Sequence, residues 1–101
     1  MKLMTKELEE RFRQVGSQED VEDPIVIAKF FAPTGGWTWY ATEYEPKDKI
    51  FFGLVHGFEE ELGYFGLKEL ESIKFPLGLG IERDLYCGEM KMSEIKRLVK
   101  Y

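Results

Sequence analysis

Three runs rich in β-branched and aromatic residues, 25–32, 37–45 and 49–56, limit the folds open to this chain. The letters P-T-G-G separate the first two runs, and E-P-K-D lies where the second gives way to the third. Both are strong turn signals. Parallel strands need a crossover of a dozen or more residues, and these connections are far shorter. The pattern therefore predicts consecutive antiparallel strands in meander order.

Helical spacing marks both ends of the chain. Leu8, Phe12 and Val15 recur at i, i+4 and i+7 after Thr5, a good N-cap, and the helix is expected to end at Gly16. Further short helices are expected over 67–73 and from Ser93, and further strands over 62–65 and 81–86. The predicted fold class is α+β. It has a three- to five-stranded antiparallel sheet, an N-terminal helix on one face and short C-terminal helices.

A chain of 101 residues is expected to form a single domain, 1–101, around one core. Residues 17–24 carry four acids and no base, and they predict an exposed linker between the first helix and the first strand. The first and third strand runs offer apolar side chains to both faces, as strands covered above and below do. The residues expected to be most buried are Leu8, Phe12, Ile27, Phe30, Phe52 and Leu54.

Acidic composition argues against two classes of partner. Nineteen acids against fourteen bases give a net charge of −5, which opposes attraction to nucleic-acid phosphates and anionic lipid. We therefore expect no direct nucleic-acid partner and no membrane partner. One cysteine, Cys87, allows no internal disulfide, and no signal peptide or apolar run of about 18 residues is recognised. These features predict a cytoplasmic protein.

Catalytic motifs are missing from the sequence, and no metal or cofactor is expected. His56 is the only histidine, so two histidine ligands on one metal are excluded. Paired carboxylates in an aromatic cleft support hydrolytic chemistry. The alternative reading is a small hydrolase or nucleic-acid-processing enzyme using Glu43, His56, Glu82 and Asp84. Glu43 would share a strand face with Trp37 and Trp39, but an ion pair of Glu43 with Arg83 or Lys29 explains the acid more simply.

A second alternative is a nucleic-acid-binding module. The aromatic run 37–40 would then stack on bases, beside a basic cluster formed by Lys91, Lys96, Arg97 and Lys100. The simpler interpretation of this cluster is the solvated face of a terminal helix.

Acidic side chains are the best candidates for partner binding. Residues 59–71 hold five glutamates and one lysine, a pattern that imitates a row of phosphates. The expected surface combines these acids with aromatic anchors: Glu59, Glu60, Glu61, Glu69, Glu71, Tyr64, Phe58 and Trp37. A non-enzymatic protein-binding function follows. The competing explanation is an acidic face that serves only solubility.

Several segments resemble a small bacterial family catalogued as domain of unknown function 2958. They are L-x-T-K-E-L at 3–8, A-K-F-F-A-P at 28–33, W-T-W-Y at 37–40, F-F-G-L-V at 51–55, E-L-G-Y-F at 61–65 and P-L-G-L-G-I-E-R-D-L-Y at 76–86. The pattern departs from the family at Gly80, where proline is usual, and at Cys87, where an aromatic residue is usual.

The resemblance implies an accessory protein of a plasmid, transposon or phage, because members of this family are typically carried on mobile elements. Combined with the acidic surface, it suggests an anti-defence inhibitor of the anti-restriction or anti-CRISPR kind. The expected partner is a basic, nucleic-acid-handling protein.

Overall fold

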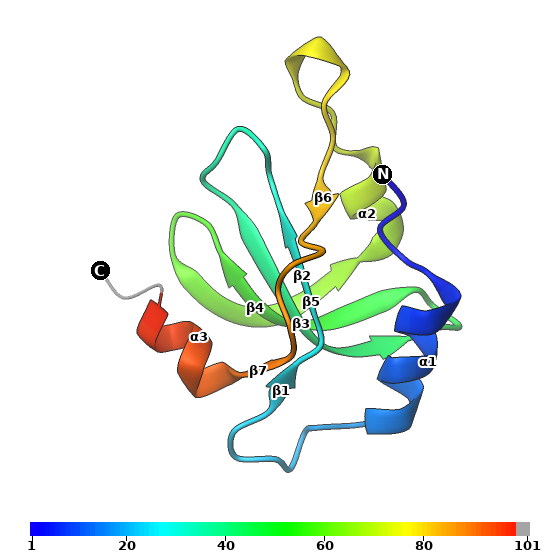
Figure 1. Cartoon of the computed structure of the whole chain (residues 1–101), viewed down its shortest axis with the longest axis vertical. Coiled ribbons are helices and arrows are strands. Elements are labelled where there is room, and N and C mark those ends of the chain that lie inside the picture. The colour runs from blue at the N-terminus through cyan, green and yellow to red at the C-terminus, as the bar shows by residue number, and fades with distance from the viewer. Residues whose placement is uncertain (99–101) are drawn as a thin grey trace.

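The computed structural model describes residues 1–98, and a five-stranded antiparallel sheet lies at its centre (Figure 1). The strand order is β5-β4-β3-β2-β6. Four strands form the predicted meander, and the fifth pairs with the outer edge of β2: β2 (Ala28–Phe31), β3 (Thr38–Glu45), β4 (Ile50–His56), β5 (Glu60–Gly66) and β6 (Glu82–Arg83). The antiparallel sheet expected from the sequence is confirmed.

The helices confirm the α+β class. They are α1 (Lys6–Val15), α2 (Leu67–Ser72), a 3₁₀ turn η1 (Pro76–Gly78) and α3 (Met92–Leu98). Thr5 Oγ1 accepts the N–H of Leu8 at 3.1 Å, which caps α1 as predicted. Gly16 ends the helix with a φ of 70°, and its N–H donates to the Phe12 carbonyl.

The run 25–32 forms two strands where the sequence predicted one. β1 (Ile25–Val26) pairs with β7 (Met90–Lys91) in a separate two-stranded sheet, while β2 belongs to the main sheet. Ile27 lies between them and donates its N–H to the Ala41 carbonyl at 2.8 Å. Apolar periodicity reports which residues are extended. It does not report which strand each of them pairs with, so the sequence could not predict that this run divides into β1 and β2.

Residues 17–24 are anchored at Gln18, which contradicts the expectation of an exposed linker at this position. The Gln18 side chain is buried; its Nε2 donates to the carbonyls of Thr42 (2.7 Å) and Ile25 (2.9 Å), and its Oε1 accepts the Ile25 N–H at 2.7 Å. Residues 19–22 are exposed, as predicted. A buried amide with three hydrogen bonds fixes the path of the chain from α1 to β1.

Asp23 holds the start of α3. The helix begins at Met92, so the expectation that Ser93 is its N-cap is wrong. The Asp23 carboxylate instead accepts both the Ser93 N–H (2.9 Å) and the Ser93 hydroxyl (2.7 Å). The hydroxyl bond, followed by the backbone bond, lowers the pKa of Asp23 below its ordinary value. The ionised carboxylate thus ties the 17–24 segment to the C-terminal helix.

Acidification is expected to release α3 at this contact. Because the folded-state pKa of Asp23 is depressed, its stabilising effect is present above the unfolded-state value of about 4 and is lost as the pH falls through the lower folded-state pKa. The chemical shift of the Ser93 amide, followed by NMR against pH, should therefore move with a midpoint below 3.8, the ordinary value for aspartate. Asp23→Asn should abolish this transition. A midpoint at or above the ordinary value would contradict the assignment.

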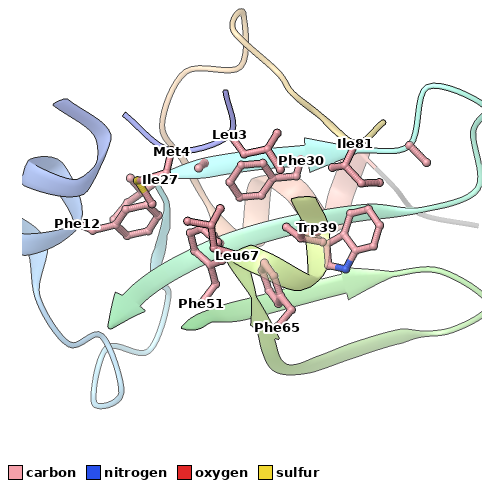
Figure 2. Close-up of a cluster of buried hydrophobic side chains, with 14 residues drawn as sticks. Leu3, Met4, Phe12, Ile27, Phe30, Trp39, Phe51, Phe65, Leu67 and Ile81 are labelled. Atoms are coloured by element: carbon pink, nitrogen blue, oxygen red, sulfur yellow. The ribbon is translucent and has the colours of Figure 1, made fainter. Parts of the chain in front are cut away.

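One face of the sheet carries the larger hydrophobic core (Figure 2). Phe51 and Phe30 are fully buried there, with ring centroids 5.2 Å apart. Phe12 from α1 reaches Phe51 at 5.8 Å, and Phe65 from β5 stacks on it at 5.3 Å. Leu67 and Leu70 of α2 also belong to this cluster, and so do Leu3 and Ile81.

The opposite face carries a smaller core of Val26, Tyr40, Leu54, Met92 and Ile95, so both faces of the sheet are covered in part. The expected burial of Phe12, Ile27, Phe30 and Leu54 is confirmed. It is wrong for Leu8 and Phe52, which are only half-buried. Adjacent residues in a strand point to opposite faces, so Phe51 occupies the larger core and Phe52 the partly covered face.

Candidate partner-binding surface

Aromatic side chains from two neighbouring turns meet at one end of the sheet. Trp37, just before β3, lies against Trp39 with ring centroids 6.0 Å apart and against Phe58 at 5.4 Å, edge to face. Gly57 makes this approach possible, because a Cβ there would lie 2.3 Å from the Trp37 ring. The Trp37 residue is 38% exposed and Phe58 is 94% exposed. Two large aromatic rings therefore face solvent side by side.

Carboxylates border these rings. Trp37, Val55 and Phe58 line a shallow hollow of about 320 Å³ together with Glu59 and Glu61. We call these five residues the aromatic tip. Four of the eight residues predicted to bind a partner belong to it, and they come from sequence segments twenty residues apart.

The other four predicted residues lie elsewhere. The Glu60 side chain points to the other face of the sheet from that of Glu61, and Glu60 pairs with His56 of β4. Tyr64 is 79% exposed on that same face, and its ring packs against Phe52 at 5.0 Å. Glu69 and Glu71 are on α2, beyond the far end of β5, which is about 20 Å long. The glutamates of 59–71 thus form separate groups instead of one row of charges.

Glu69 also has a role inside the chain. Its Oε1 accepts the N–H of Gly66 at 3.3 Å and so caps the first turn of α2.

Two larger hollows of about 490 and 410 Å³ meet at Glu43, Phe52 and Tyr64. One extends toward α1, and the other extends toward Gln18 and α3. Sequence reasoning found Tyr64 but missed the groove, because it placed Glu43 on the other face. Thr42 forms a β-bulge between Ala41 and Glu43, which reverses the alternation. Glu43 consequently shares a face with Phe52 and not with Trp39.

The residues of the alternative catalytic reading do not converge. His56, Thr38, Phe31 and Glu82 occupy one row across β4, β3, β2 and β6, so three strand spacings, about 14 Å, separate His56 from Glu82. Glu43 lies five residues along β3 from Thr38, roughly 15 Å away. General acid–base catalysis needs partners within hydrogen-bond reach or one water apart.

Asp84 closes a turn and holds Lys29. Its Oδ1 accepts the N–H groups of Tyr86 (2.9 Å) and Cys87 (3.0 Å), and its Oδ2 lies 3.5 Å from Lys29 Nζ. The ion pair of Lys29 is therefore with Asp84 and not with Glu43. Burial raises the pKa of the Cys87 thiol, partly offset by nearby Lys29, so the less nucleophilic protonated form is favoured at neutral pH.

The structure also shows whether the described residues could hold a metal ion, span a bilayer or stack on nucleic-acid bases. Among residues 1–98, no three His, Cys, Asp or Glu side chains are placed to hold a metal ion. None of the helices in that range is long and apolar enough to span a bilayer. Trp39 and Tyr40 are buried and unavailable for stacking on bases. Lys91, Lys96 and Arg97 are exposed, and Lys100 lies outside the described residues.

Comparison with known proteins agrees with the resemblance seen in the sequence segments. A family model described as "Protein of unknown function (DUF2958)" matches residues 3–100, nearly the whole chain. No curated protein and no solved structure matches the chain. The chain belongs to the DUF2958 family.

Proposed function

We propose that this chain is a non-catalytic protein-binding module that docks on a basic partner through its aromatic tip. The observation that carries the proposal is the exposure of Phe58 beside Trp37, flanked by Glu59 and Glu61. Aromatic side chains that become desolvated supply much of the affinity of protein interfaces. Carboxylates around them mainly set the association rate and the choice of partner.

Catalysis is disfavoured by the distances between its candidates. His56 and Glu82 are separated by two intervening strands, and Asp84 is engaged by backbone N–H groups and Lys29. Direct binding of nucleic acid is disfavoured by the net charge of −5 and by the burial of Trp39 and Tyr40.

The proposed partner is a basic, nucleic-acid-handling protein. Arginine and lysine side chains that normally contact phosphates can instead pair with the carboxylates of Glu59 and Glu61. In the mobile-element setting implied by the family resemblance, the chain would act in the cytoplasm as an accessory protein of a plasmid, transposon or phage. Its specific form would be an anti-defence inhibitor that covers the nucleic-acid-binding surface of a restriction or CRISPR component.

Photocrosslinking from position 58 in native host cells tests the proposal. Phe58→p-benzoylphenylalanine should give an adduct with a basic protein, identified by mass spectrometry. Adding Glu59→Lys and Glu61→Lys to this variant should lower the yield of the adduct several-fold. The matched control is Tyr86→p-benzoylphenylalanine, because Tyr86 is 97% exposed outside the aromatic tip. The proposal fails if position 58 gives no adduct, or if position 86 captures the same protein with equal yield.

A further inference from the structure

β5 forms one edge of the main sheet. It is hydrogen-bonded to β4 alone, and no other strand of residues 1–98 pairs with its outer edge (Figure 1). The register with β4 runs without a bulge from Glu60 to Gly66. β5 contains neither proline nor lysine, residues that commonly protect such an edge. The unpaired N–H and C=O groups of such an edge strand can pair with another chain.

The backbone groups that face outward can be identified from two hydrogen bonds. Leu67 N–H donates to the Lys49 carbonyl (2.9 Å), and Gly57 N–H donates to the Glu59 carbonyl (3.1 Å). Hydrogen-bonded and non-hydrogen-bonded pairs alternate along an antiparallel ladder. The odd-numbered residues of β5 therefore bond to β4, while Glu60, Leu62 and Tyr64 direct their N–H and C=O groups outward.

The side chains of these three residues complete the edge. They share the face of the sheet that α3 and the β1–β7 pair cover in part, where Leu62 is 59% exposed and Tyr64 is 79% exposed. Phe52 lies beside Tyr64 and extends the apolar surface inward. An added strand would gain backbone hydrogen bonds and apolar contacts together.

The charges at the two ends of β5 determine which kind of strand can pair with its outer edge. Glu60 and Glu61 lie at one end, and the Glu69 carboxylate lies at the other, on the outward N–H of Gly66. A second copy of the chain pairing antiparallel about Gly63 would bring Glu60 against the Gly66 and Glu69 of its partner. Like charges so placed repel. An extended segment with apolar residues in its middle and basic residues at both ends matches the edge instead.

We infer that the partner protein adds a basic-ended extended segment to β5 as a sixth strand. The inference rests on the proposed protein-binding function and specifies the chemistry of the bound segment. Phe58 and Glu59 immediately precede β5, so the aromatic tip adjoins one end of the strand edge. The segment's backbone pairs with Glu60, Leu62 and Tyr64, and its terminal lysines or arginines contact Glu60 and Glu69.

Residue-specific amide hydrogen exchange by NMR tests strand addition with three synthetic peptides. The probe is KRVTVTVRK, and the controls are its analogue with N-methylated valines and the acidic peptide EEVTVTVEE. With the peptide KRVTVTVRK at about 1 mM, a complex whose dissociation constant is about 1 mM is half formed. Amide exchange at Glu60, Leu62 and Tyr64 should then slow about twofold. Gly63 and Phe65, already bonded to β4, should not change. Neither control peptide should have this effect.

Substitutions at Leu62 separate backbone pairing from side-chain contact. Leu62→Pro removes one outward donor and leaves the odd-numbered bonds to β4 intact, as proline at a strand edge can. Leu62→Ala removes the side chain and keeps the N–H. Strand addition predicts a several-fold larger loss of peptide affinity for Leu62→Pro than for Leu62→Ala. Thermal unfolding of both variants identifies any loss due to folding, and Tyr64→Pro repeats the test at the next outward residue if Leu62→Pro does not fold.

The inference is overturned if KRVTVTVRK leaves the three outward amides unprotected, or if a control peptide protects them equally. It is also overturned if these amides become protected as protein concentration rises without peptide, because the occupant would then be a second copy. The proposals of strand addition at β5 and of docking at the aromatic tip can be contradicted independently. Peptide protection without a crosslink from position 58 would retain strand addition and remove docking at the aromatic tip, and the converse result would do the opposite.

Discussion

Phe51→Ala is expected to lower the free energy of unfolding by about 3–5 kcal/mol. Phe51 is fully buried and its ring contacts Phe12, Phe30, Tyr44 and Phe65 at centroid distances of 4.7–5.8 Å. Removing it leaves a cavity where α1 meets β2, β3 and β5. Against a total stability of about 5–15 kcal/mol, the variant should be close to unfolding at 25 °C, as measured by urea denaturation.

Phe52→Ala is the matched control, because the same ring is removed one position along the same strand. Phe52 is half-buried and its ring packs against that of exposed Tyr64, so its loss is expected to cost roughly 1–2 kcal/mol. Equal losses for the two variants would contradict the assignment of faces in β4. A larger loss for Phe52→Ala would reverse it.

The strands of this fold were readable from the sequence because their signals are local. Alternation and β-branched residues marked β3 and β4, and the P-T-G-G and E-P-K-D letters marked the turns between them. Thr5 and Gly16 marked the ends of α1 for the same reason. The existence and order of these elements depend on residues only a few positions apart.

The faces of the sheet were less readable because they depend on distant contacts. The alternation over 37–45 gives no sign of the bulge at Thr42. At the bulge, the Thr42 carbonyl accepts from Gln18, twenty-four residues away, and its hydroxyl donates to the Phe52 carbonyl. A single extra residue moved Glu43 to the opposite face and removed it from the predicted aromatic cleft.

The aromatic tip was predicted only in part from the sequence, because the direction of each side chain also depends on the folded structure. Exposed acids and aromatic residues over 58–61 predicted a surface, and the meander placed Trp37 beside them. The sequence could not show that Glu60 points away from Glu59 and Glu61, nor that Glu69 is engaged by Gly66. Strand parity and local capping therefore divided one predicted acidic row into separate groups.

Charge reversal at the aromatic tip should slow association with the partner captured from position 58. For Glu59→Lys with Glu61→Lys, we expect the association rate constant to fall about tenfold or more at low salt, and its dependence on ionic strength to weaken. Phe58→Ala should instead raise the dissociation rate constant by roughly 10–100-fold, because an aromatic anchor of 2 kcal/mol or more is lost. Surface plasmon resonance at several salt concentrations measures both rate constants.

The matched control changes the same charge at another place. Glu7 and Asp20 are exposed acids that line neither the aromatic tip nor the hollow beside Leu62 and Tyr64, so Glu7→Lys with Asp20→Lys shifts the net charge equally. If steering comes from carboxylates beside the docking rings, this control should leave the association rate within about twofold at about 0.1–0.15 M salt, where charges beyond the Debye length of roughly 8–10 Å are screened. If both double variants slow association alike, the net charge of the chain steers the partner. Glu59 and Glu61 would then have no specific part in steering the partner.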